Sequence, residues 1–347
     1  MIVRARPISD GTGSGVTAQE WVLDHDQVRE HGFERYEGTP LDVRAVVAGM
    51  PRSVKDGFRF DAVPWGRFRH AHGAADDVPG LLARLRSGDA AAADAALGRL
   101  WGSLVHQGTV GSAAPLAVPF LLRTAADPAA HHRVDTLGLA TAAARLAHWG
   151  HGTRDTFLQG TPPEWRYDCG GYAMNWSIEA SRTALGADAD VLLALLRDPD
   201  PELRTGACHA LGVSSGEAVR ATDALRARLT AEESPAVRAS LVLAVAELAR
   251  GQARRRAAAW TGALWSDPAW PADVRVAAAL ARLCLDDGPV PDGLRTTVDA
   301  LVTDDLAAVL GRVPWIAHVD TEDGLARTLG QMLDGAAPGV PDPDPWA

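Results

Sequence analysis

The sequence predicts an all-α solenoid of stacked antiparallel helix pairs, with an irregular N-terminal extension and a long inserted loop. Three segments share one pattern: a proline after Asp or Ser, an apolar residue followed by Arg, and an Ala-rich apolar helix. The arginines are Arg204, Arg238 and Arg275, which lie 34 and 37 residues apart. This period is typical of stacked helix pairs, and the periodic segments have the 3.6-residue spacing of helices. At 47 % apolar residues, the 347-residue chain can bury a continuous core.

The composition argues against several classes of protein. A formal net charge of −10 disfavours nonspecific binding to nucleic acid. No apolar run approaches the roughly 20 residues of a membrane span, and no secretory signal follows the first arginines. Cys169, Cys208 and Cys284 are few, odd in number and widely spaced, so a disulfide framework or a zinc ribbon is not expected. We expect a cytoplasmic protein without metal or cofactor.

Signals at helix ends place the elements in order. Asp76-Asp77-Val78-Pro79 starts the first regular helix, because acids and an early proline favour a helix N-terminus. We expect further helices over 89–105, 114–126 and 132–149, and a restart near Asn175. The expected divisions are an N-terminal extension over 1–62, first helix pairs over 63–150, an aromatic loop and helix over 151–186, regular repeats over 187–290, a C-terminal helical cap over 291–337 and a tail over 338–347.

The repeat arginine is expected to be structural. It lies in the first turns of the second helix of each pair, where it can reach an acid or a carbonyl of the neighbouring repeat. Arg133 occupies the same place, 71 residues before Arg204, which is close to two periods. One repeat is therefore remodelled. Its replacement, 150–174, contains five Gly and two Pro and cannot form a long helix.

The repeated Asp-Pro-x-x-x-apolar-Arg-x-x-Ala pattern, over about residues 76–290, resembles HEAT repeats, including the short bacterial type of phycobilin-lyase-like proteins. The first part is similar to actinobacterial HEAT-repeat proteins of unassigned role. The shared motifs are a His-Ala-x-Gly-x-Ala-x-Asp-Val-Pro opening at 70–79 and a His-Gln-Gly-Thr-Val turn at 106–110. The N-terminal extension and the aromatic loop depart from that group. The resemblance implies a fold and no single activity, because this fold hosts scaffolds, immunity proteins, lyases and some DNA glycosylases.

Two groups of residues are candidates for a site. The first joins His70, His72, Asp76, Asp77 and the pair His106-Gln107, because one helix ends where the other histidines precede a helix. A His beside a carboxylate can act as a general base. The alternative is that these residues are caps and turn hydrogen bonds at helix ends.

The second group is the long loop with its flanks. Aromatic walls with a few fixed polar groups are typical of a small-molecule pocket or a binding hot spot, and the alternative is a loop packed by its own side chains. His148 and His151 lack a third metal ligand, and Cys169 could be a nucleophile. The group consists of His148, Trp149, His151, Arg154, Asp155, Trp165, Arg166, Tyr167, Asp168, Cys169, Tyr172, Asn175, Trp176 and Glu179.

Three functions stay open at this point. The first is a binding protein whose concave face and 150–176 loop hold a protein or small molecule. The second is an enzyme of specialised metabolism, with His106, His151, Asp168 and Glu179 as tentative acid–base residues. The third is an alkylpurine DNA glycosylase, which the acidic charge disfavours. The expected binding residues are His70, His72, Gln107, Trp149, Arg154, Trp165, Tyr167, Tyr172, Asn175 and Trp176. A binder should spread these residues over a surface, whereas an enzyme should enclose them in one pocket.

Overall fold

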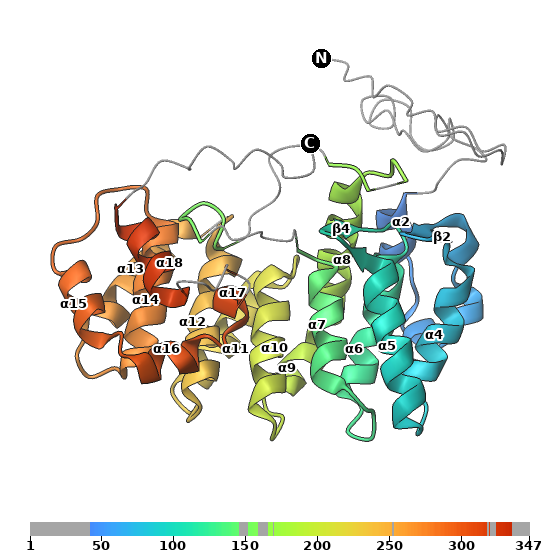
Figure 1. The fold of residues 1–347 in the computed structure, drawn as a ribbon, viewed down its shortest axis with the longest axis horizontal. Coiled ribbons are helices and arrows are strands. Elements are labelled where there is room, and N and C mark those ends of the chain that lie inside the picture. Colours follow the sequence, from blue (N-terminus) through green and yellow to red (C-terminus); the bar gives the residue numbers. More distant parts are fainter. Residues whose placement is uncertain are drawn as a thin grey trace, which may run out of the picture. The chain divides into compact units, whose positions relative to one another are not determined.

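Helices form almost all of the regular structure. The computed structural model describes residues 42–145, 152–158, 166–168, 170–251, 253–317, 319 and 324–334. These residues contain seventeen α-helices and two short β-hairpins, so the prediction of an all-α fold of packed helices is confirmed (Figure 1). None of the helices in these ranges combines the length and the apolar character that crossing a membrane requires. The chain divides into an N-terminal unit, 1–147 with 162–188, and a C-terminal unit, 148–161 with 189–347.

The N-terminal unit packs helices on both sides of a long apolar helix, α6. Almost every residue of α6 is buried, and α7, α8, α4, α3 and α2 all contact it. The elements are α2 (Val43–Ala48), α3 (Arg52–Asp56), β1 (Arg69–His70), β2 (Gly73–Ala74), α4 (Val78–Leu85), α5 (Ala90–Leu104), β3 (Val105–His106), β4 (Thr109–Val110), α6 (Ala114–Ala126), α7 (Arg133–Ala142) and α8 (Met174–Ala187).

Local sequence signals explain where these elements begin. The Asp89 carboxylate accepts hydrogen bonds from the amides of Ala91 and Ala92 and so caps α5. Beyond α5, β3 and β4 pair antiparallel around a tight turn. Gln107 and Gly108 in that turn have φ of +46° and +79°. Two consecutive positive φ values are typical of a type I′ hairpin turn, which favours glycine at the second position. The motif at 106–110 is therefore a β-hairpin.

The only lysine of the chain is part of the core of this unit. Lys55 is buried, and its Nζ donates to Asp188 Oδ1 at 2.8 Å. Arg123 of α6 donates to the same oxygen at 3.0 Å and to Asp56 at 2.7 Å. Because these four charged residues come from α3, α6 and the end of α8, the cluster holds the three helices together.

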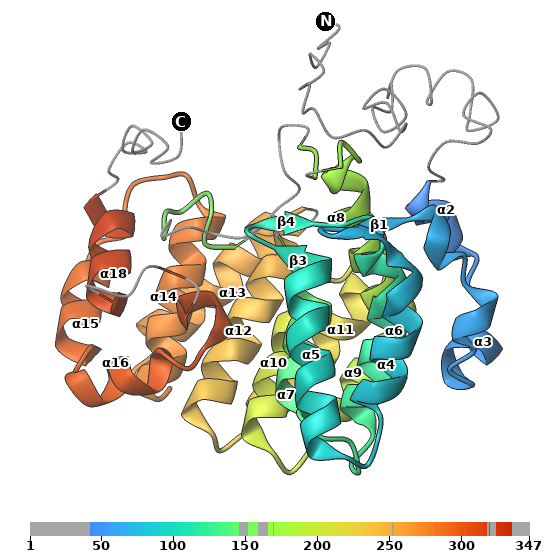
Figure 2. The same cartoon turned by 45° about the vertical axis from the view of Figure 1, so that its right-hand side comes forward.

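The C-terminal unit stacks three apolar helices, α10, α12 and α14, side by side. α11 and α13 pack against this row, and α16, α17 and α18 also contact it (Figures 1 and 2). The elements are α9 (Ala189–Leu195), α10 (Pro201–Val213), α11 (Ala218–Leu229), α12 (Pro235–Ala249), α13 (Arg254–Ser266), α14 (Ala272–Leu285), α15 (Leu294–Leu301), α16 (Asp304–Leu310), α17 (Pro314–Ala317) and α18 (Gly324–Asp334).

The repeat arginines join successive helices of this row. Arg204 of α10 makes two hydrogen bonds, of 3.0 and 2.8 Å, to the carboxylate of Glu232, just before α12. Arg238 of α12 does the same to Asp273, in the first turn of α14, at 2.8 and 2.9 Å. Arg275 instead donates to the carbonyl of Trp265, at 3.0 Å. The expected ladder from arginine to the next repeat is thus present at two steps, as bidentate ion pairs.

Candidate functional site

One edge of the N-terminal unit brings together three regions that are far apart in the sequence. They are the hairpins 69–74 and 105–110 and the segment 166–175, and we call their union the hairpin edge (Figure 2). The amide of Val110 donates to Met174 Sδ at 3.3 Å, which joins the second hairpin to α8. The amide of Ala113, just after that hairpin, donates to the Arg69 carbonyl of the first at 3.0 Å.

Three imidazoles lie together on the hairpin edge, as the order of the helices predicted. The rings of His70 and His72 are 5.9 Å apart between centroids, and those of His72 and His106 are 5.5 Å apart. His70 is buried, its Nε2 lies 2.8 Å from Asp77 Oδ1, and its Nδ1 accepts the amide of His72 at 3.1 Å. Both ring nitrogens of His70 are therefore used within the protein, whereas His72 is exposed and His106 half-buried.

Asp168 fixes the turn at the start of the 166–175 segment. Its Oδ1 accepts the amides of Gly170 and Tyr172, both at 2.9 Å, and its side chain is buried with 8 % of the residue exposed. Burial raises the pKa of this carboxyl, while amide hydrogen bonds and the charge of Arg69 act in the opposite direction. The residue lies where the sequence placed a candidate acid–base group, and its carboxylate holds the local backbone.

Tyr172 and Trp176 belong to the core beneath the hairpin edge. The Tyr172 hydroxyl accepts the amide of Val43 at 3.0 Å, and burial raises its pKa. Trp176 is 2 % exposed, meets the Tyr172 ring edge-on at 6.2 Å, and lies 4.2 Å below the guanidinium of Arg44. Arg44 also pairs with the exposed Glu179 at 3.0 Å. These aromatic rings therefore hold α2 against α8 and do not form an open wall.

The exposed part of the hairpin edge is carried by a few side chains. Tyr167 is 40 % exposed, and Gln107 and Arg166 are exposed as well. Asn175 Oδ1 accepts the amide of Arg166 at 2.8 Å and so fixes the backbone beside Tyr167. Tyr167 and Val219 are the two large apolar side chains that are exposed within the described ranges.

The long loop is divided between the two units. Its 152–158 part belongs to the C-terminal unit, where Arg154 donates to the carbonyls of Met332 and Gly288 at 2.7 and 3.3 Å. Phe157 and Leu158 are buried in that unit. Arg154 therefore has a structural role there. The predicted residues His148, Trp149, His151, Trp165 and Cys169 lie outside the described residues.

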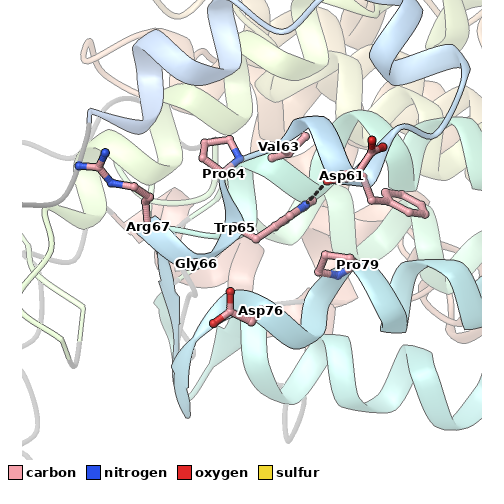
Figure 3. Close-up of a pocket in the computed structure, with 9 residues that line it drawn as sticks. Asp61, Val63, Pro64, Trp65, Gly66, Arg67, Asp76 and Pro79 are labelled. Atoms are coloured by element: carbon pink, nitrogen blue, oxygen red, sulfur yellow. Dashed lines mark hydrogen bonds between the residues drawn. The ribbon is translucent and has the colours of Figure 1, made fainter.

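A shallow pocket of about 420 Å³, which no sequence motif predicted, lies beside the first hairpin (Figure 3). Trp65 lies against it and donates from Nε1 to the carbonyl of Phe60 at 2.9 Å. Asp76, which the sequence grouped with the histidines, lines this pocket instead. Its carboxylate packs on Gly66, where a Cβ atom would come within 2.5 Å of Oδ1. A tryptophan between Pro64 and Gly66 was the available sequence signal.

Comparison with known proteins supports the repeat assignment over a limited stretch. Residues 181–246, which include α10, α11 and most of α12, match the family model of HEAT repeats. This stretch contains Arg204 and Arg238 and the Arg204–Glu232 ion pair. No curated protein and no solved structure matches the sequence.

Proposed function

We propose that this protein is a HEAT-repeat binding module whose hairpin edge holds a segment of a partner protein. HEAT repeats act by presenting surfaces to partners, and residues 181–246 are similar to them. A cytoplasmic location, predicted by the few and scattered cysteines, is part of the same proposal.

The observation that carries this proposal is how the polar and aromatic residues are distributed. Gln107, His72 and Tyr167 face solvent from three different segments of one edge. In contrast, the two buried groups with acid–base chemistry are used internally: His70 by Asp77 and a backbone amide, and Asp168 by two amides. This favours recognition of a surface over general acid–base catalysis, which needs an ionisable group that faces a substrate.

The chemistry of the edge favours a polypeptide partner. An exposed tyrosine on the same edge as imidazole and amide groups offers a flat ring and several hydrogen-bonding positions, which is the composition of many protein-binding hot spots. The row α10–α12–α14 is a less accessible alternative, because α16–α18 already lie on it.

Site-specific photocrosslinking tests the proposal. A photoreactive phenylalanine analogue is placed at Gln107 of the full chain, and at the exposed Ala95 of α5 in the same unit as a control. In extracts of the source organism we expect a discrete adduct at position 107 that is absent at position 95. The captured protein is then identified, and its affinity is measured for the wild type and for Tyr167→Ala. Equal capture at both positions, or an unchanged affinity, would contradict the proposal.

A further inference from the structure

The central helix of the C-terminal unit, α12, is buried around its whole circumference over residues 239–247. Every residue from 239 to 247 of α12 is buried, and so is every residue from 276 to 281 of α14. A helix that packs in a two-layer array needs only one apolar stripe. Burial all round requires a further cover in addition to the neighbours α10 and α14 and the packed helices α11 and α13. Contacts from α16 and α17 to α12 and α10 supply it.

The cover is anchored by one tryptophan in a shaped pocket. Trp315 of α17 is 2 % exposed, and its Nε1 donates to Glu247 Oε2 at 2.5 Å. Its ring meets the His209 imidazole edge-on at a centroid distance of 4.7 Å. Gly212 makes the space, because a Cβ atom there would lie 3.1 Å from Trp315 Cζ2. We call the site formed by His209, Gly212 and Glu247 the indole pocket.

The indole pocket contains a buried polar group, the Glu247 carboxylate, which is not required for close packing of apolar side chains. Glu247 is buried on an otherwise apolar stretch of α12, where a leucine would fill space without any desolvation of a charge. A carboxylate at this position accepts the indole N–H, so it selects for tryptophan over other large apolar side chains. A small residue, an aromatic contact and a buried hydrogen-bond acceptor together are typical of a site that recognises one kind of side chain.

The cover itself is built from short helices. α16 has seven residues and α17 has four, lengths at which an isolated helix is unstable in water. Their position depends on what they bury, which includes Leu310, Val313, Trp315 and Ile316. The cover therefore resembles a peptide bound to the row of helices more than a further repeat.

We propose that residues 303–317 are an internal ligand of the groove on α10 and α12, and that they compete there with a partner segment that inserts a tryptophan into the indole pocket. This groove is separate from the hairpin edge, and the inference does not depend on the function proposed for that edge. The partner segment is apolar and short, with one indole N–H directed at Glu247.

Peptide binding in trans tests this inference. A labelled peptide of residues 303–317 is titrated against the full-length wild type, Trp315→Ala and, as a matched control, Trp265→Ala on α13. Fluorescence anisotropy should show binding to Trp315→Ala at least ten times tighter than to the wild type or to Trp265→Ala. A peptide that carries Trp315→Ala should not bind. If both peptides bind Trp315→Ala alike, or if neither binds the folded variant, the inference is wrong.

A second variant decides the matter if Trp315→Ala does not fold. Trp315→Phe keeps an aromatic ring in the indole pocket but removes the N–H group that donates to Glu247. Hydrogen exchange of segment 303–317 should then become at least ten times faster, while the protection of α12 stays unchanged. Equal loss of protection in both segments would show that the cover is an inseparable part of the core, which overturns the inference.

Discussion

The two units use their polar residues in different ways. In the C-terminal unit, Arg204 and Arg238 form ion pairs with carboxylates of the next repeat. The helix α12, which these pairs join to its neighbours, is largely apolar. In the N-terminal unit, one β-hairpin precedes α4 and another connects α5 to α6, and histidine, glutamine and tyrosine side chains lie at one edge. The regular helices of the C-terminal unit are thus linked by ion pairs, and the hairpins of the N-terminal unit carry exposed polar side chains. The following substitutions test that contrast.

The largest effect is expected from Trp176→Ala. Its ring is enclosed by Tyr172 and Arg44, so removing it should lower the free energy of unfolding by roughly 3–5 kcal/mol. The comparison variant Leu195→Ala removes a smaller buried side chain on α9 and should cost roughly 2–5 kcal/mol. Urea unfolding followed by circular dichroism measures both. A loss below about 1 kcal/mol for Trp176→Ala would mean that the ring is not part of the core.

Arg204→Met is expected to lower the free energy of unfolding by less than Trp176→Ala. This change removes the bidentate pair to Glu232, but Arg228 still donates to the same carboxylate at 2.7 Å. We expect a loss of roughly 2–3 kcal/mol, since hydrogen bonds to buried charged groups are individually strong. The control Arg228→Met removes the more exposed partner and should cost less. If urea unfolding shows a larger loss of stability for Arg228→Met than for Arg204→Met, the ion pairs of the repeat arginines are not the main link between repeats.

The same carboxylate predicts a pH dependence. Burial raises the pKa of Glu232, but hydrogen bonds from Arg204, the Ser234 amide and Arg228 outweigh it and lower the pKa to about 2. Because the folded pKa lies below the unfolded one, this group stabilises the fold above about pH 4.5, and the contribution is lost as the pH falls towards 2. Glu232→Gln should flatten this part of the stability–pH curve. An unchanged slope would assign the acid sensitivity to other carboxyls.

Substitutions of the buried and the exposed histidine of the hairpin edge should have different effects on stability. His70→Ala removes a buried ring whose two nitrogens are hydrogen-bonded, and should cost roughly 1–3 kcal/mol. His72→Ala, at an exposed position two residues away, should change stability by less than about 0.5 kcal/mol. Thermal melts of the two variants compare them directly. Equal losses would place His72 in the core of the hairpin.

Much of the helical framework could be predicted from the sequence. The expected helix over 114–126 coincides with α6, and that over 89–105 differs from α5 by one residue at each end. The described part of α7, in contrast, ends at Ala142, although periodicity suggested a helix over 132–149. Proline, acidic caps and repeat spacing are local signals, and so they set most helix starts correctly.

The site was harder to predict, for a physical reason. An aromatic cluster looks the same in a sequence whether it lines a surface or fills a core, and Trp176 and Tyr172 proved to be core. The nearly continuous apolar sequence of α12 also did not reveal that α16 and α17 cover α12 and α10, because periodicity reports burial and not the identity of the covering element. The grouping of His70, His72 and His106 succeeded because helix order brings their turns together.

The most direct test of the central claim compares the two large apolar side chains that are exposed in the described part of the chain, one in each unit. Tyr167 lies on the hairpin edge with 40 % exposed, and Val219 lies on α11 with 78 % exposed. With the partner captured through Gln107, isothermal titration should give a dissociation constant at least about tenfold higher for Tyr167→Ala, or roughly 1.4 kcal/mol of binding free energy. Val219→Ala should leave it within about twofold. An unchanged affinity for Tyr167→Ala with a loss for Val219→Ala would place the binding surface on the regular repeats and contradict the account.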